Sequence, residues 1–432
     1  MNKNQKKIYI FTSAACNYLP KVRLLTKSIR DFHPECYIVV GLSDALNPSE
    51  QIPDETWDEV ISVAQLDIPR WRPWAFTHNI VELSTAIKPF LLLSLLQRDN
   101  CAAVYYFDPD MVLFSRVDDM FAHLQGANIV LTPHLTTQES GIERVIDNEI
   151  SSLKHGVYNL GFIGVNATSE GFKFTEWWAD RTYHFCRDDI PNGLFTDQRW
   201  IDLAPALFDG VSIARNPRFN VAPWNLTTRT LTGNKSSGLL VNGYPLGFYH
   251  FTGFDSGAHR IMAAKYNACN TTLIELVDWY EDRCRVASTD SLSRRKWAFG
   301  YYSDGTLVQS SHRRIFQQLP ELQTRYEDPF LVLQAQDCYL NWIHSTGARQ
   351  YPTLLPTLSK SPDWSPFIGT LRPSLSTPAE SVDRSAQIVF ASMRSVSGVI
   401  TVLRYAWTAA KRDGARLFLR KLLRLVLRML RG

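Results

Sequence analysis

Apolar and polar residues follow two patterns along the first quarter of the chain, short apolar runs and helical spacing, which predict short strands separated by helices. Residues 7–12, 36–42 and 59–63 are runs rich in Ile, Val and Tyr, as expected for strands. Residues 20–32 and 80–97 have apolar positions at helical spacing, and each segment contains a proline suited to a first turn or a break. This order predicts an α/β fold with a mostly parallel sheet sandwiched by helices.

A further apolar run, residues 102–107, ends in two carboxylates separated by a proline, Asp108-Pro109-Asp110. Burying one ionised carboxylate beside apolar strands is costly, and burying two that repel each other costs more. A divalent cation relieves both costs, because hard oxygen ligands suit Mg²⁺ or Mn²⁺. The carboxyl end of a strand in an open α/β sheet is also where ligands bind. The pattern predicts a metal site, with a solvated turn as the alternative.

Other polar positions also lie in apolar surroundings: Lys88, Asn159, Thr196-Asp197-Gln198 and His250. Lys88 lies on an otherwise apolar helix, so we expect its charge to meet a ligand or an acid, or else to reach the surface. Asn159 lies on an expected strand, residues 157–165, whose glycines also allow close packing. The Asp197 run opens a helix, where a capping role is the simplest explanation. A histidine on a strand is likewise more often structural than functional.

The composition is that of a globular chain of 432 residues, 45% hydrophobic and 12% aromatic, which suggests two or three units. Seven scattered cysteines without a Cys-x-x-Cys pair favour a reducing compartment and argue against a disulfide framework or a zinc site. No glycine-rich dinucleotide or phosphate loop follows the first strand. The first apolar run is interpreted as a strand rather than a signal peptide, and no run approaches the roughly 18 apolar residues of a membrane span.

An ordered set of motifs covers about residues 7–260: Phe11-Thr12-Ser13, Asn17-Tyr18, Lys88, Asp108-Pro109-Asp110, the run 158–166, Thr196-Asp197-Gln198, Arg218-Phe219-Asn220 and the run 249–253. This set resembles that of glycosyltransferase family 8, a GT-A fold family whose bacterial members build lipopolysaccharide outer cores. The resemblance implies a GT-A nucleotide-sugar-binding catalytic domain over residues 1–265. It also implies transfer of a hexose from a nucleotide sugar, with UDP favoured, to a glycan or lipid-linked glycan such as lipopolysaccharide or capsule.

The resemblance further implies roles for individual residues. Asp108, Asp110 and His250 match the metal ligands, with Mn²⁺ or Mg²⁺ as the cofactor. Asp197 and Gln198 match the catalytic pair beneath the donor sugar in a reaction that retains the anomeric configuration. The substrate-binding positions are Thr12, Ser13, Tyr18, Lys88, Asn159, Asn220 and Arg260.

The resemblance assigns a specific contact to several of these substrate-binding positions. Tyr18 matches the residue that stacks on the nucleotide base, since an aromatic face suits any base. Lys88 matches a diphosphate contact and Asn159 a sugar contact. The chain departs from the family after His250, where it lacks the usual Gly-x-x-Lys-Pro-Trp motif. Arg260 or His259 is the expected substitute for the missing lysine.

Beyond residue 265 the resemblance weakens, and the pattern predicts three further parts. Residues 266–350 form an accessory segment, with a helix over 274–285 and a hairpin around Asp304-Gly305. This segment either borders the acceptor site or is a structural appendage. Residues 351–385 are a linker rich in Pro, Ser and Thr. Residues 386–432 are a basic amphipathic helical tail.

The charge of the chain is concentrated in that tail. Residues 404–432 carry nine Lys or Arg against one Asp, a net charge of +8, so the rest of the chain carries 4 − 8 = −4. Arginines that recur every four residues beside a broad apolar face suit an anionic membrane surface. We therefore predict a cytoplasmic protein that is peripherally associated with the inner face of the cell membrane. A tail docked on its own domain or on a partner is the alternative, and nucleic acid is not expected as a partner.

Four other functions are compatible with an Asp-x-Asp after an apolar strand. They are an inverting glycosyltransferase, a sugar nucleotidyltransferase, a HAD-type phosphatase and a non-catalytic membrane scaffold. The phosphatase motif normally opens its domain, whereas here an α/β pattern precedes it, and a scaffold would have no need of both acids. A metal-dependent, retaining glycosyltransferase is therefore the prediction.

Overall fold

A computed structural model describes residues 6–46, 52, 55–267, 269–288, 290–333 and 337–352. Apart from residues 351 and 352, the predicted linker (351–385) and basic tail (386–432) lie outside this part of the chain. The described residues fall into two compact units. The first holds the residues up to Thr252 and those from Asn270 onwards, and the second holds the short segment from Gly253 to Cys269, which contains helix α11 (Ala258–Asn267).

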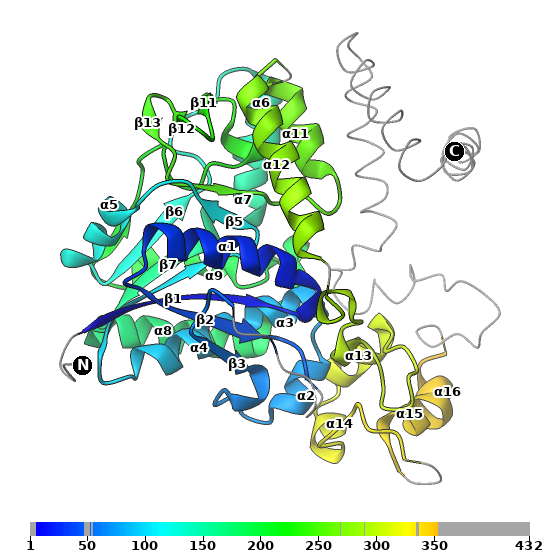
Figure 1. Cartoon of the computed structure of the whole chain (residues 1–432). Coiled ribbons are helices and arrows are strands. Elements are labelled where there is room, and N and C mark those ends of the chain that lie inside the picture. The colour runs from blue at the N-terminus through cyan, green and yellow to red at the C-terminus, as the bar shows by residue number, and fades with distance from the viewer. Residues whose placement is uncertain are drawn as a thin grey trace, which may run out of the picture. The chain divides into compact units, whose positions relative to one another are not determined.

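A seven-stranded sheet forms the centre of the first unit (Figure 1). Its strands follow the order β10-β6-β7-β4-β1-β2-β3. All neighbours pair in parallel except β7, which is antiparallel to both β4 and β6. The expected mostly parallel sheet is confirmed. Its strands are β1 (Lys7–Ala14), β2 (Tyr37–Leu42), β3 (Glu59–Ser62), β4 (Cys101–Phe107), β6 (Ile129–Pro133), β7 (Tyr158–Asn166) and β10 (Val211–Ile213).

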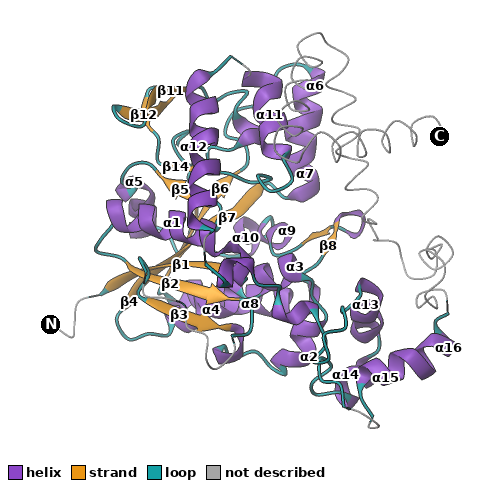
Figure 2. Ribbon diagram, turned by 45° about the vertical axis from the view of Figure 1, so that its right-hand side comes forward, coloured by secondary structure: helices purple, strands orange, loops and turns teal. Residues whose placement is uncertain are grey.

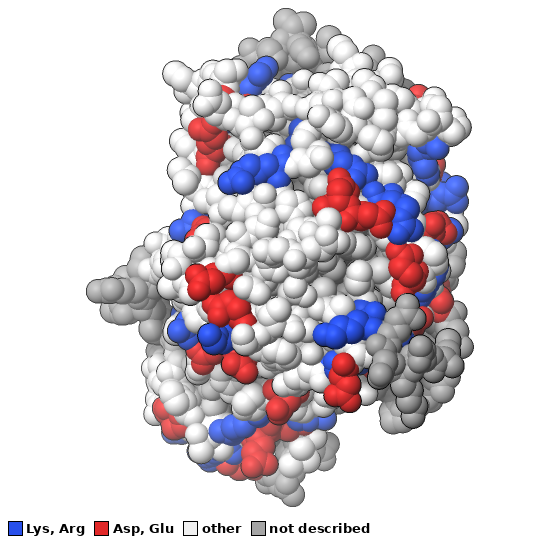
Figure 3. Space-filling model, turned by 90° about the vertical axis from the view of Figure 1, so that its left-hand side faces the viewer, with Lys and Arg blue, Asp and Glu red and all other residues white. Residues whose placement is uncertain are grey.

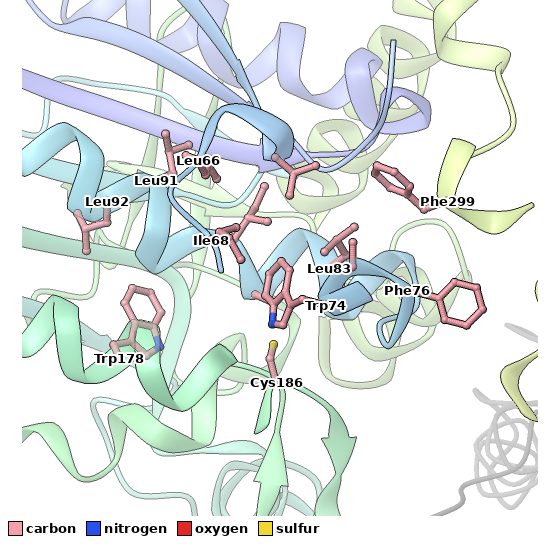
Figure 4. Packing of buried hydrophobic residues seen from close by; sticks show 14 of the residues in the cluster. Leu66, Ile68, Trp74, Phe76, Leu83, Leu91, Leu92, Trp178, Cys186 and Phe299 are labelled. Carbon is pink, nitrogen blue, oxygen red and sulfur yellow. The ribbon is translucent and has the colours of Figure 1, made fainter. Parts of the chain in front are cut away.

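The central strand β4 sends successive side chains into two different cores, as the pleat of a strand requires. Tyr105 and Phe107 pack into a cluster that includes the apolar face of α1 (Leu19–Phe32). Val104 and Tyr106 pack into the opposite cluster, with side chains of α4 (Lys88–Leu96) and α8 (Ser169–Phe185). Figure 4 shows Leu91, Leu92 and Trp178 of this second cluster. Each fully buried side chain of this kind contributes about 1.5–3 kcal/mol relative to exposure. Helices therefore cover both faces of the sheet.

The helix expected over residues 80–97 is two helices, α3 (Ile80–Ala86) and α4. Asn79 caps α3 by accepting hydrogen bonds from two backbone N–H groups, and Glu82 completes the capping box. Pro89 lies in the first turn of α4, where a proline costs no helical hydrogen bond. The break places Lys88 at the first position of α4 rather than in the middle of a helix.

In the described part of the chain, shorter strands that the pattern did not predict form three small sheets separate from the central one. Strand β5 (Met111–Leu113) directly follows the Asp-Pro-Asp turn and pairs antiparallel with β14 (Phe248–His250). The remaining strands are β8 (Asp188–Asp189), β9 (Leu194–Phe195), β11 (Leu231–Asn234), β12 (Gly238–Val241) and β13 (Tyr244–Pro245). The other short helices here are α2 (Trp71–Phe76), α5 (Asp118–Phe121), α6 (Ile142–Arg144), α7 (Ser151–His155), α9 (Gln198–Ile201) and α10 (Ala204–Leu207).

The accessory segment begins with α12 (Thr271–Ala287), which confirms the helix expected over 274–285. Its later helices are α13 (Ser310–Gln318), α14 (Pro320–Arg325), α15 (Tyr339–Trp342) and α16 (Ala348–Gln350). Of these, α13, α14 and α15 lie beside α2 (Figure 2), and aromatic side chains surround Phe76, among them Phe316 and Tyr339 with ring centroids 5.1 and 5.3 Å away. The contacts give this part of the segment a packing role within the first unit.

The expected hairpin around Asp304-Gly305 is only partly correct. The turn itself forms, with Gly305 at a φ of 86° and Asp304 accepting a hydrogen bond from the Thr306 N–H. The flanking residues make a single antiparallel bridge, between Tyr301 and Leu307, rather than two strands. Aromatic residues of this stretch instead pack into the core, and Phe299 lies within the same cluster as Phe76.

Two features of the described residues bear on partners. None of their helices is both long and apolar enough to cross a bilayer. On the face shown in Figure 3, acidic and basic side chains are interspersed.

Candidate metal centre and donor site

Asp108, Asp110 and His250 come together where β4 ends. Strand β14 pairs with β5 so that His250 lies opposite Met111, and the Phe251 N–H donates to the Asp110 carbonyl oxygen over 2.8 Å. The His250 Nε2 atom is 3.0 Å from an Asp110 oxygen and 3.7 Å from an Asp108 oxygen. One ligand atom from each residue lies within 4.8 Å of the other two.

This donor set fits a divalent cation. Two carboxylates and one imidazole are a borderline set that suits Mn²⁺ better than Ca²⁺. Burial would raise the pKa of Asp110, but the charge and hydrogen bond of His250 lower it. Burial would likewise lower the pKa of His250, yet Asp110 raises it. Asp110 and His250 thus each stabilise the charged form of the other.

A second group of candidate ligands, His33, Glu35 and Cys36, does not fit a metal. The His33 Nε2 atom accepts a hydrogen bond from the Val117 N–H at 3.0 Å, so Nδ1 carries the proton and donates to Glu35. The ring has no lone pair left for a cation. Burial also raises the pKa of the Cys36 thiol to about 12, which disfavours the thiolate that a metal needs.

Lys88 lies between the metal centre and Asp197. Its ammonium is 3.2 Å from Asp108 and 3.1 Å from Asp197, and its side chain is 3% exposed, so it does not reach the surface. Burial would lower the pKa of Lys88, but the two carboxylates raise it well above its usual value. Burial raises the pKa of Asp197, and the like charge of Asp108 adds to the rise, although the Lys88 ammonium opposes it. The expectation that this lysine meets an acid is confirmed.

The end of β1 is linked to the same acids through Tyr106. The Tyr106 hydroxyl donates to Asp108 and lies 3.2 Å from the Ser13 hydroxyl. The Ser13 hydroxyl also contacts the Ser84 carbonyl oxygen at 2.7 Å. The Thr12 hydroxyl oxygen is buried and has no hydrogen-bond partner among the described residues. These contacts connect β1, α3 and β4 at the carboxyl edge of the sheet.

Asp197 and Gln198 occupy the start of α9. Asp197 stands at the N-cap position, but its side chain makes no capping hydrogen bond, so capping does not explain the residue. The Gln198 Oε1 atom accepts from the Leu160 N–H at 2.9 Å and from the Asn159 amide at 3.3 Å. The Gln198 Nε2 group donates to the His155 carbonyl oxygen at 2.9 Å. Gln198 is therefore held between two backbone groups.

The remaining predicted substrate positions are Tyr18, Asn220 and Arg260. Tyr18 is half-buried, with the Lys21 ammonium 4.0 Å from its ring centroid. The Asn220 amide is buried at a φ of 53°, and neither of its polar atoms has a partner among the described residues. Arg260 lies on α11 in the second unit. Their roles stay predictions.

Two residues of the site, Lys21 and His134, were not predicted from the sequence. Lys21 is buried on α1, and its charge contributes to lowering the pKa of Asp110, after the larger effect of His250. Its position on the apolar stripe of the helix, four residues before Leu25, is a signal in the sequence. His134 follows β6 and is buried, and desolvation lowers its pKa to about 4. No local pattern marks that residue.

Comparisons with known proteins give distant similarities. No family model matches the chain. Two proteins of Bacillus subtilis (strain 168), both named as uncharacterized, are similar in sequence. YfnD is 25% identical over 258 residues, which cover 58% of this chain and 76% of YfnD. YfnF is 27% identical over 251 residues, which cover 56% of this chain and 82% of YfnF.

Among solved structures, the galactosyltransferase LgtC in complex with donor and acceptor sugar analogs has a TM-score of 0.39 at 16% identity, covering 66% of this chain and 97% of LgtC. The glycosyltransferase GlyE of Streptococcus pneumoniae TIGR4 has a TM-score of 0.37 at 13% identity, covering 68% of this chain and 66% of GlyE. Similarities this distant assign no activity, which has to be argued from the site itself.

Proposed function

We propose that this protein is a metal-dependent glycosyltransferase that moves a hexose from a nucleotide sugar, with UDP favoured, to a surface glycan such as lipopolysaccharide or capsule. One observation supports the proposal above all others. The Asp108–Asp110–His250 cluster lies at the carboxyl end of a central strand, and Lys88 joins it to the Asp197 pair. Such an edge is where α/β sheets bind nucleotides.

The proposed roles follow from charge. Asp108, Asp110 and His250 would hold Mn²⁺ or Mg²⁺, which when bound would neutralise the charge that develops on the departing diphosphate. Lys88 adds a buried positive charge beside the same acids. Lys21 supplies a further positive charge from α1, the helix that packs on the other face of the sheet from α4. The edge is thereby suited to an anionic leaving group.

Asp197 is the proposed stabiliser of positive charge on the donor sugar, because a carboxylate opposes an oxocarbenium-like centre that forms only in the transition state. Gln198 holds this turn in place through its two backbone contacts. An amide is a poor nucleophile, so we favour attack of the acceptor on the same face as the leaving diphosphate, which acts as the base. This pathway retains the anomeric configuration.

The remaining predicted contacts complete the proposal. Thr12, Ser13, Tyr18, Asn220 and Arg260 are proposed to bind the donor, with Tyr18 stacking on the base. The basic tail is proposed to hold the protein at an anionic membrane surface, where a lipid-linked acceptor would be found. Deletion of residues 386–432 should then reduce binding to anionic vesicles and leave donor hydrolysis unchanged. Unchanged vesicle binding would contradict the membrane role.

The activity is tested by incubating the full chain with a panel of nucleotide sugars and Mn²⁺, and by measuring release of the nucleoside diphosphate. We expect one or more UDP-hexoses to be turned over only with the metal. Asp108→Asn should lower the rate at least 100-fold, whereas Asp118→Asn, an exposed acid paired with Arg116, should leave it unchanged. Metal-independent turnover, or an Asp108→Asn protein as fast as the parent, would contradict the proposal.

A further inference from the structure

A row of four buried side chains joins the metal centre to the backbone of β7. The His250 Nδ1 atom lies 3.2 Å from the Asn159 Oδ1 atom. The Asn159 Nδ2 group lies 3.3 Å from Gln198 Oε1 and 3.3 Å from His134 Nε2. All four side chains are at most 8% exposed. The order of donors and acceptors along this row can be worked out from its backbone end.

Two backbone groups fix the orientation of Gln198. The Leu160 N–H is a donor, so the atom that it meets at 2.9 Å is Oε1. The His155 carbonyl is an acceptor, so the atom that it meets at 2.9 Å is Nε2. A flipped amide would place donor against donor and acceptor against acceptor, and a buried unsatisfied group costs about 1–3 kcal/mol. Gln198 therefore presents an oxygen to Asn159.

The orientation of Asn159 follows in turn. Its NH₂ group must face the Gln198 oxygen, and the same group has a second hydrogen to donate to His134 Nε2. His134 can accept there because its Nδ1 atom faces the Val157 carbonyl at 3.3 Å and carries the proton. The Asn159 Oδ1 atom is then the one that faces His250, so Nδ1 of His250 is the donor.

We propose that Asn159, held by Gln198 and His134, is a positioning residue that keeps the proton of His250 on Nδ1. Nε2, 3.0 Å from Asp110, is then the nitrogen that would give up its proton when a cation binds between the carboxylates, and its lone pair would become the metal ligand. The inference rests on the proposed metal site, and it differs from the sugar contact that the family resemblance implied for Asn159. The amide donors and the Oδ1 atom are already engaged within the protein.

Metal affinity distinguishes a role of Asn159 in positioning His250 from a role in contacting the sugar, without any assay of sugar transfer. We would titrate the full-length protein with Mn²⁺ and follow the free ion by electron paramagnetic resonance. Asn159→Leu keeps the size of the side chain and removes its polar atoms. We expect its Kd for Mn²⁺ to rise at least tenfold, within the 10- to 100-fold range typical when a partner of a metal-binding histidine is lost. Asn159→Asp keeps the acceptor oxygen and should bind Mn²⁺ at least as tightly as the parent.

A matched control is Asn148→Leu, which removes another fully buried amide, one that contacts Glu139 and Thr227 instead. It should lose a similar amount of stability and keep the parental Kd. If Asn159→Leu does not fold, His134→Phe tests the same row, because the ring is retained beside Trp224 while the acceptor is lost. We expect a Kd at least threefold higher for that variant.

Each outcome bears on one claim. A folded Asn159→Leu or His134→Phe protein whose Kd lies within twofold of the parent would overturn the positioning role and leave the metal site standing. An Asn148→Leu protein that loses as much Mn²⁺ affinity as Asn159→Leu would also overturn it. A parent protein that binds no Mn²⁺ would overturn the proposed function itself.

Discussion

Replacing Lys88 by Met tests the electrostatic arrangement on which the site depends. The substitution keeps the length of the side chain and removes its charge. Asp197, which is 2% exposed, then loses its cation, and Asp108 loses one as well. At an effective dielectric constant of about 20, each contact near 3.1 Å is worth roughly 5 kcal/mol before the cost of burying the lysine is subtracted. Removing one partner of such a pair typically costs about 3–5 kcal/mol.

The assay is equilibrium unfolding in urea at pH 7 without metal. We expect Lys88→Met to lower the free energy of unfolding by about 3–5 kcal/mol. The double variant Lys88→Met/Asp197→Asn should recover part of that loss, since no buried carboxylate is left facing an apolar side chain. Lys27→Met is the surface control, because its pair with Asp31 is exposed, and it should change stability by no more than about 0.5 kcal/mol.

The pH dependence provides a second check. The pKa of Asp197 is raised in the folded protein, chiefly by burial. Without Lys88 it should rise further, so folding then favours the protonated carboxyl. Such a group stabilises the fold at low pH and stops doing so as the pH rises through its folded pKa. The stability gap between Lys88→Met and the parent should therefore narrow as the pH falls from 7 to 4. A gap that is constant with pH, or a double variant whose losses simply add, would refute this reasoning.

Two further predictions concern packing and protonation. Gly161→Ala would place a methyl group 2.7 Å from the His250 ring, so we expect this variant to bind Mn²⁺ more weakly than the parent. Gly126→Ala is the control, because its added methyl group would meet nothing within 4 Å, and it should bind Mn²⁺ as the parent does. Equal Mn²⁺ affinities of the two variants would contradict the close approach at Gly161. Burial lowers the pKa of His312 to about 4, so its stabilising effect is present above about pH 6.5 and is lost as the pH falls towards 4. Between pH 7 and pH 5, the free energy of unfolding in urea should fall by about 2 kcal/mol more for the parent than for His312→Phe. Identical pH profiles of the two proteins would contradict this.

Local pattern was sufficient to predict five of the seven strands of the central sheet and the acids at its edge, whereas β6 and β10 were not predicted. The run that forms β4 is apolar over its whole length, so its boundaries and the exit of Asp108 and Asp110 could be read directly. Helices α3 and α4 were predicted as one helix. The features that define them separately, the capping contact between Asn79 and Glu82 and the turn at Pro89, each involve only a few residues.

The links between distant segments could not be predicted from local pattern. Gln198 was expected to lie beneath a sugar, but its contacts with Leu160 and His155 depend on how α9 packs on β7. His134 carries no signal, since a histidine after a strand is common and only its contact with Asn159 makes it significant. The hairpin at Asp304 forms only its turn and one bridge for the same reason, because the aromatic residues of this stretch, such as Phe299, pack into the core.

The most direct test of the central claim is anomalous diffraction from crystals of the full-length protein grown with Mn²⁺ and UDP. We expect a single strong manganese peak bonded to Asp108, Asp110 and His250, at about 2.0–2.3 Å from each ligand atom, with the diphosphate completing the coordination. A cation bound elsewhere, or UDP bound at this edge with no peak between the two carboxylates, would contradict the account.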